Sequence, residues 1–173
     1  MVKLLEIEAK ILEIDKKDLE TKLRRLGAKK TRERKVESQF FDFSKNSLRK
    51  KGTILRLRLD GKKAMLAVKK KKGKASLKEL DEFEVEVSDF KETRRMLSLI
   101  GLKEKSSITK KRTSFKLGRT GIEIDKISGI PYFAEIEAPS EKQVVAMAKK
   151  LGFSKKQLLS WSMFDVLRHY KKK

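Results

Sequence analysis

The sequence predicts an α+β protein, and three observations lead to this class. Segments with a period of two alternate with segments of helical period along the whole chain. The motif Glu-x-Glu occurs on three predicted strands, each of which runs into a predicted helix. A glycine follows each of these helices, as is typical of a helix C-terminus. The motifs are Glu6-Ile7-Glu8, Glu84-Val85-Glu86 and Glu135-Ile136-Glu137, and the glycines are Gly27, Gly101 and Gly152.

The helices are predicted from their capping residues and apolar stripes. Asp15 and Asp18 have the spacing of a capping box, and Ser140 and Gln143 repeat that spacing. Leucines three and four residues apart follow the first of these caps. We therefore expect helices over Asp15–Leu26, from Ser88 or Asp89 to Ile100, over Ser140–Leu151, and a short one from Ser162.

Between the helices, apolar and charged residues alternate, which predicts strands with one apolar and one charged face. About eight such segments are present. They are Leu5–Ile11, Phe40–Phe43, Leu55–Asp60, Met65–Lys69, Glu82–Val87, Arg112–Leu117, Ile122–Asp125 and Ala134–Glu137.

Length and composition limit the possible classes of protein. The 173 residues fit one domain over 1–173, and charged residues make up 40%. The net charge of +22 creates a field that attracts polyanions. With no cysteine, disulfides and thiolate metal sites are excluded. The N-terminus reaches Glu6 too soon for a signal peptide, and no apolar run could span a bilayer, so we expect a cytoplasmic protein without membrane partners.

The charged faces of the strands distinguish two arrangements. In an ordinary half-buried sheet the polar face lies in water. Here that face carries almost only full charges, and acidic strands are separate from basic ones. If the sheet instead closes into a barrel with these faces inward, about eight strands enclose one small ligand. Carboxylates suit Mg²⁺ or Mn²⁺, and arginine suits phosphate, so such a cavity fits a metal–polyphosphate complex.

Several segments resemble a known family, in chain order. Glu6-Ile7-Glu8-Ala9-Lys10 resembles the N-terminal E-x-E-x-K signature of the CYTH superfamily, the triphosphate tunnel metalloenzymes. Later segments resemble the strands of that family: Gln39-Phe40-Phe41-Asp42-Phe43, Leu55-Arg56-Leu57-Arg58, Lys69, Glu82-Phe83-Glu84-Val85-Glu86, Arg112, Glu123-Ile124-Asp125 and Phe133-Ala134-Glu135-Ile136-Glu137. One departure is Leu80-Asp81, where many members carry an arginine before the middle acidic strand.

The resemblance implies a fold and a set of roles. The fold is a closed antiparallel eight-stranded β-barrel, the triphosphate tunnel, with helices packed on its outside. The divalent metal, Mg²⁺ or Mn²⁺, would be held by Glu6, Glu8, Glu135, Glu137 and Asp125, with Glu82, Glu84, Glu86 and Glu123 in support. The triphosphate would be held by Lys10, Arg56, Arg58, Lys69 and Arg112, of which Lys10, Arg56 and Arg58 would be catalytic.

Three functions stay open from the sequence. The resemblance favours a metal-dependent enzyme most like a class IV adenylate cyclase, which converts ATP to cyclic AMP and pyrophosphate. An inorganic or thiamine triphosphatase is the first alternative, and its substrates would be tripolyphosphate or thiamine triphosphate. A non-catalytic binder of RNA, DNA or polyphosphate is the second, which the net charge of +22 permits but does not favour. The chain is expected to be a monomer or a homodimer.

Overall fold

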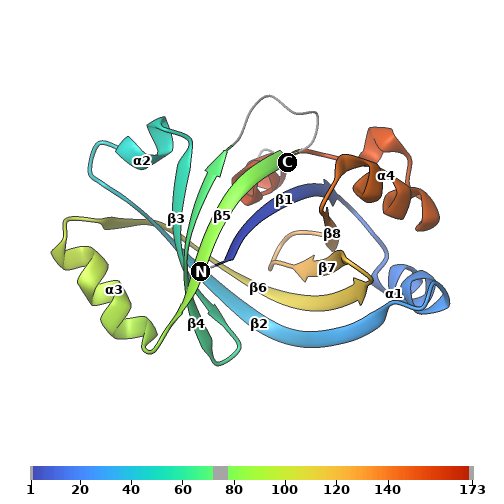
Figure 1. Ribbon diagram of the computed structural model, residues 1–173, viewed down its shortest axis with the longest axis horizontal. Coiled ribbons are helices and arrows are strands. Elements are labelled where there is room, and N and C mark those ends of the chain that lie inside the picture. Colours follow the sequence, from blue (N-terminus) through green and yellow to red (C-terminus); the bar gives the residue numbers. More distant parts are fainter. Residues whose placement is uncertain (1, 72–77, 172–173) are drawn as a thin grey trace. The chain divides into compact units, whose positions relative to one another are not determined.

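Eight strands form one hydrogen-bonded sheet in the order β1-β5-β4-β3-β2-β6-β7-β8, which closes into a barrel. The computed structural model describes the backbone of residues 2–71 and 78–171 and the side chains of 7–70 and 81–171 (Figure 1). The strands are β1 (Val2–Ile11), β2 (Lys29–Asp42), β3 (Thr53–Asp60), β4 (Lys63–Lys71), β5 (Lys78–Val87), β6 (Lys103–Leu117), β7 (Thr120–Lys126) and β8 (Phe133–Ala138). The predicted α+β class and eight-stranded antiparallel barrel are confirmed.

The helices begin at the capping residues that the sequence indicates. The Asp15 carboxylate accepts a hydrogen bond from the backbone N–H of Asp18 at 2.8 Å, and Asp89 accepts one from Glu92 at 2.7 Å. Each cap satisfies a backbone donor that has no partner within its own helix. The helices are α1 (Lys16–Arg25), α2 (Ser47–Lys50), α3 (Phe90–Leu99), α4 (Glu141–Lys150), the 3₁₀ turn η1 (Lys155–Gln157) and α5 (Met163–Lys171). None of the helices in the described residues is long and apolar enough to cross a membrane.

The chain divides into two compact units. Of the described residues, unit 1 contains 2–5, 34–71 and 80–110, and unit 2 contains 6–33, 78–79 and 111–171. Each unit has a hydrophobic core of its own. That residues 1–173 form a single domain stays a prediction.

In unit 2 the helices cover the apolar face of the sheet. The core contains Ile122 and Ile136, both fully buried, on β7 and β8. Leu23 of α1 and Val144 of α4 belong to the same core and are equally buried. Figure 1 shows α1 and α4 beside each other at this end of the ribbon. Because side chains alternate along a strand, the residues next to Ile122 on β7 and next to Ile136 on β8 belong to the opposite face of the sheet.

In unit 1 the core is smaller. Leu55 and Leu57 of β3 pack with Phe41 of β2, and Leu97 of α3 covers them. The strands β2, β3, β4 and β5 pair antiparallel in that order. The residues between the leucines of β3 are Arg56 and Arg58, so the arginines share the face away from α3.

The short helix α2, which the sequence pattern does not predict, is held by a buried carboxylate. Asp42 accepts hydrogen bonds from the backbone N–H groups of Phe43, Leu48 and Arg49 at 2.7, 2.9 and 3.0 Å. Burial disfavours the charge of this group, yet these hydrogen bonds hold the pKa of Asp42 below its ordinary value. Asp42 is therefore a structural residue of this turn.

Candidate functional site

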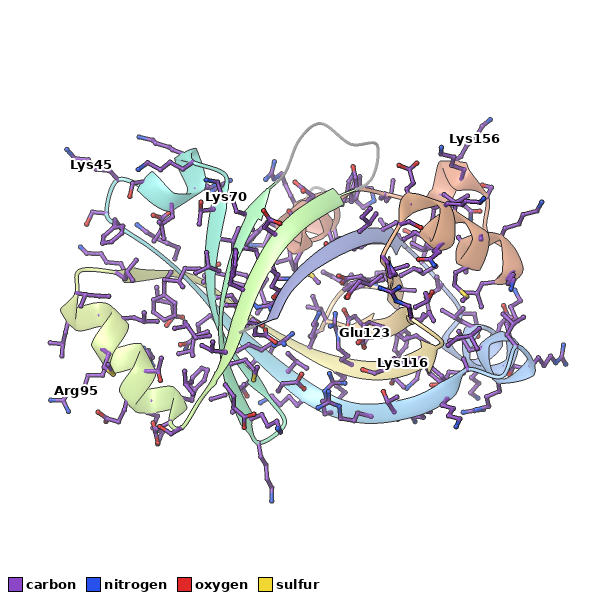
Figure 2. The ribbon with its side chains drawn as sticks, in the orientation of Figure 1. Lys45, Lys70, Arg95, Lys116, Glu123 and Lys156 are labelled. Atoms are coloured by element: carbon purple, nitrogen blue, oxygen red, sulfur yellow. The ribbon has the colours of Figure 1, made fainter. Side chains whose placement is uncertain are left out.

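In unit 2 the face opposite the core is built almost wholly of charged residues. The strands β6, β7, β8 and β1 pair antiparallel and place these side chains on one face. We call this set the acidic cluster; it contains Arg112, Ser114, Glu123, Asp125, Glu135, Glu137, Glu8 and Lys10. Figure 2 shows Glu123 on the concave side of these strands. Carboxylates outnumber cations in the acidic cluster.

Lys10 lies between the carboxylates of Glu8 and Glu135. Its Nζ is 3.2 Å from Glu8 Oε1 and 3.4 Å from Glu135 Oε2, and its side chain is 3% exposed. Burial alone would disfavour the ammonium, but Glu135 and Glu8 outweigh this effect and raise the pKa of Lys10. Lys10 is therefore a permanently charged group inside the acidic cluster.

Arg112 is held by a fully buried carboxylate. Its Nε and one terminal nitrogen each donate to Asp125 at 2.7 Å, which is a bidentate pair. The same terminal nitrogen lies 3.4 Å from Glu135 Oε2, and Nε lies 3.7 Å from Glu123. Burial opposes the charge, but the carboxylates, Asp125 foremost, raise the pKa of Arg112 well above its ordinary value. Asp125, predicted as a metal ligand, thus directs both of its oxygens at this guanidinium.

Two pairs of glutamates lie directly opposite each other on neighbouring strands. Glu8 pairs in register with Glu137, and Glu123 pairs with Glu135. Like charges at such positions destabilise a sheet unless a cation lies between them. Carboxylate oxygens are also the ligands that Mg²⁺ and Mn²⁺ prefer, so the chemistry of the donor set fits a divalent metal.

The glutamates are nevertheless arranged around the basic side chains and not around a common point. Among the described residues, no three Asp, Glu or His side chains are grouped as metal ligands would be. The predicted ligand Glu6 belongs to β1, but its side chain lies outside the described residues. Lys10 and Arg112 provide the positive charge in this arrangement.

In unit 1 the corresponding face carries the predicted phosphate ligands, which we call the arginine cluster: Arg56, Arg58, Lys69, Glu82 and Glu84. One terminal nitrogen of Arg56 donates to Glu82 at 2.9 Å and to Glu84 at 3.0 Å. Arg58 donates to both oxygens of Glu84, at 3.0 and 2.9 Å, and Lys69 pairs with Glu82. These side chains are mostly buried, with 8–25% of each exposed.

Arg56 has a buried donor without an acceptor among the described residues. The Nε–H of Arg56 is buried and forms no hydrogen bond with the described residues. A buried donor without a partner costs free energy, and a phosphate oxygen would satisfy it. The arginine cluster therefore has unused capacity for an anion.

Some residues depart from the predicted grouping. Glu86 follows Glu82 and Glu84 on β5, but it is exposed and pairs with Lys63 at 3.0 Å. Conversely, Arg34 and Asp60 form an ion pair on the same face as the arginine cluster, and neither was predicted as a site residue from the sequence. Asp60 could have been predicted to lie on this face, because it follows Arg56 and Arg58 at the same spacing of two residues.

Comparisons with known proteins identify the family of this chain and proteins of the same fold. The family model of the CYTH domain matches residues 4–164. A Methanocaldococcus jannaschii protein, provisionally named an adenylate cyclase, is 25% identical over 94% of this chain and 98% of its own. The structure of a Vibrio parahaemolyticus protein with the same provisional name has a TM-score of 0.82 at 20% identity, covering 95% of this chain and 98% of its own.

A third relative carries a different activity. The structure of a Hippeastrum protein, provisionally named an adenylyl cyclase and described as having a dominant triphosphatase activity, has a TM-score of 0.68 at 18% identity. It covers 95% of both chains. At these identities the two structural likenesses show the fold. The family match covers most of the sequence, and the chain therefore belongs to the CYTH domain family.

Proposed function

We propose that this chain is a divalent-metal-dependent enzyme that acts on a triphosphate, most like a class IV adenylate cyclase. The observation that carries the proposal is the acidic cluster, in which Glu8 faces Glu137 and Glu123 faces Glu135 beside the buried cations Lys10 and Arg112. A face with this composition offers ligands to a metal and to the phosphates that accompany it.

The residues divide into three roles in this proposal. Glu8, Glu135 and Glu137, with Glu6, hold Mg²⁺ or Mn²⁺, which when bound supplies Lewis-acid stabilisation of phosphate oxygens. Lys10 and Arg112 bind phosphate oxygens, and Asp125 keeps the Arg112 guanidinium oriented. Arg56, Arg58 and Lys69 bind phosphate through the arginine cluster, where Glu82 and Glu84 position them. Fixed cations that stabilise charge on the transferred and leaving phosphates are the main source of catalysis in such reactions.

Two reactions are consistent with this arrangement. In the cyclase reaction the ribose 3′-oxygen of ATP attacks the α-phosphorus, its proton is lost, and pyrophosphate leaves. In the triphosphatase reaction water attacks a phosphorus, and phosphate or pyrophosphate leaves. The names of the Methanocaldococcus and Vibrio proteins favour the first, and the activity of the Hippeastrum protein favours the second.

The experiment that tests the proposal is a product assay. The protein is incubated with Mg²⁺ or Mn²⁺ and, in separate reactions, with ATP, tripolyphosphate or thiamine triphosphate. Cyclic AMP, pyrophosphate and phosphate are then quantified. Cyclic AMP identifies a cyclase, and phosphate release without cyclic AMP identifies a triphosphatase. If none of the three substrates is turned over, the proposal of an enzyme is refuted, and a non-catalytic polyanion binder is the function that remains.

Two variants assign the activity to the acidic cluster. Glu8→Gln and Glu137→Gln each remove one charge from a facing pair, and we expect turnover to fall by on the order of 100-fold. The matched control is Glu92→Gln on α3, an exposed carboxylate outside both clusters that lies 3.9 Å from Arg95. Near-normal activity in both cluster variants would refute the site assignment.

A further inference from the structure

Helix α3 of unit 1 presents an apolar face to solvent. Met96, Leu99 and Ile100 are 65, 78 and 67% exposed, and they lie three and four residues apart. The backbone N–H of Ile100 donates to the Met96 carbonyl at 3.2 Å, so Ile100 continues the last helical turn. Residues at this spacing share one side of a helix. These three are the most exposed of the large hydrophobic side chains in the part of the chain that the structure describes, and together they form one patch.

The core of unit 1 uses a different side of α3. Leu97 is buried in that core, and Phe90 packs against it. Residues four apart form rows along a helix. Leu99 lies in the row of Lys91 and Arg95, and Met96 and Ile100 lie in the next row, so neither row contains Leu97. The packing of α3 on its sheet therefore does not explain the apolar face.

Three cations adjoin this apolar face. An open hollow on α3 is lined by Phe90, Lys91, Arg94, Arg95 and Ser98. Because Lys91 and Arg95 share a row with Leu99, the cations and the apolar side chains are neighbours. Figure 2 shows Arg95 pointing away from the ribbon of α3. We call the set the α3 surface: Lys91, Arg94, Arg95, Met96, Leu99 and Ile100.

The cations of the α3 surface are only loosely held by carboxylates. Arg94 Nε lies 3.6 Å from Glu104, and a terminal nitrogen of Arg95 lies 3.9 Å from Glu92. Lys91 forms no ion pair with a described side chain. Exposed pairs at such distances contribute little to stability. All three cations are exposed and can therefore turn toward an anionic ligand.

The charge of the α3 surface distinguishes its possible occupants. A second copy bound at this face would bring the same cations together, between two chains that each carry a net charge of +22. An anionic phospholipid surface instead attracts the cations, and its headgroup phosphates accept their hydrogen bonds. Apolar side chains that project from a helix can enter the acyl boundary of a bilayer without a preformed groove. Projecting apolar side chains beside exposed cations thus match an anionic membrane.

We propose that the α3 surface binds anionic phospholipid membranes from one side. Met96, Leu99 and Ile100 enter the acyl boundary, while the three cations contact headgroup phosphates. This contact needs no membrane-spanning segment, and it departs from the expectation of no membrane partners. It is independent of the proposed triphosphate chemistry, because every residue of the α3 surface lies outside the acidic cluster and the arginine cluster.

The test is cosedimentation with vesicles of phosphatidylcholine, either pure or with about 30 mol% of the anionic lipid phosphatidylglycerol. The unchanged protein should bind the anionic vesicles and not the neutral ones. The triple variant Met96→Gln, Leu99→Gln and Ile100→Gln keeps the net charge and should lower the partition coefficient by at least about 10-fold. Urea titration checks that each variant is folded.

A second pair of variants separates the local cations from the general charge. Lys91→Gln with Arg95→Gln should lower the partition coefficient by about 25-fold, at about 5-fold for each cation near the lipid surface. The matched control, Lys142→Gln with Lys156→Gln, removes two exposed cations of unit 2 and lowers the net charge equally. Its effect should stay below about 3-fold, because exposed charges farther than about 10 Å from the lipid are screened by salt.

Three outcomes would overturn the proposal. Equal binding of the triple variant and the unchanged protein would show that net charge alone attracts the membrane. Equal weakening by the two double variants would show the same. Absence of binding to anionic vesicles at about 50 mM salt would exclude the membrane. In that case, a dimer in analytical ultracentrifugation that the triple variant dissociates would assign the face to a second copy, and a monomer would leave an acidic protein as its occupant.

Discussion

The buried pair of Arg112 and Asp125 allows a quantitative test of how the acidic cluster is held. Replacing Arg112 by Met removes both of the 2.7 Å hydrogen bonds to Asp125, which is fully buried. The carboxylate is then left buried without its counterion, and such a change costs about 3–5 kcal/mol. Domains are stable by only about 5–15 kcal/mol in total, so the loss would be a large part of the stability.

The assay is equilibrium unfolding in urea, which gives the free energy of unfolding of each variant. The double variant Arg112→Met with Asp125→Val removes the orphaned charge together with its partner. Because apolar replacement of both partners of a buried pair is often neutral, the double variant should recover at least about 2 kcal/mol relative to Arg112→Met. If Arg112→Met costs less than about 1 kcal/mol, or if the double variant is as unstable as the single one, the reasoning is wrong.

Three further predictions concern stability, measured by the same urea titration. Asp42→Asn should lower the free energy of unfolding by about 1–2 kcal/mol at neutral pH. Because the pKa of Asp42 is lowered in the folded protein, its contribution to stability is full above about pH 4 and is lost as the pH falls through the folded pKa. The difference in the free energy of unfolding between the variant and the unchanged protein should therefore disappear in acid. A constant difference down to low pH would contradict this. Leu23→Ala should cost about 2–5 kcal/mol because Leu23 is fully buried between α1 and the sheet, and a loss below about 1 would contradict the packing. Asp15→Ala should cost about 1 kcal/mol by removing the cap of α1, whereas Asp15→Ser should keep most of it.

The starts of the helices could be predicted because their signals are local. Asp15, Asp89 and Ser140 each lie three residues before the backbone N–H that they accept from, so the pattern is contained in four consecutive residues. At the start of the short helix expected from Ser162, the backbone N–H of Ser162 donates to the Asp165 carboxylate and that of Asp165 donates to the Ser162 hydroxyl. The alternation that predicted the strands is local in the same way.

The lengths of two strands could not be predicted, because their outer parts lack an apolar face. β2 begins at Lys29, yet residues 29–33 are all exposed and show no alternation of burial. β6 begins at Lys103, and its first residues are exposed in the same way. These segments are strands because of their pairing, which depends on residues distant in the sequence.

The partners within the site were also beyond prediction from spacing. The acidic and basic strands could be identified, but the register that places Glu8 opposite Glu137 is set by pairing across about 130 residues of chain. Asp125 directs its carboxylate at Arg112, which lies opposite it on β6, and the spacing of the acidic residues did not indicate this partner. Asp42 lies within a segment that resembles a family strand, and its contacts to α2 depend on a loop whose fold the pattern does not encode.

The ion pairs that Lys10 forms with Glu8 and Glu135 have a consequence for ligand binding. A divalent cation that approached Glu8 and Glu135 by itself would have to displace Lys10, which would then be a buried charge with fewer partners. A cation that arrives with a triphosphate also brings oxygens that accept from Lys10 and Arg112. On the proposed function, each ligand should therefore tighten the binding of the other, and by reciprocity the two effects should be equal in size.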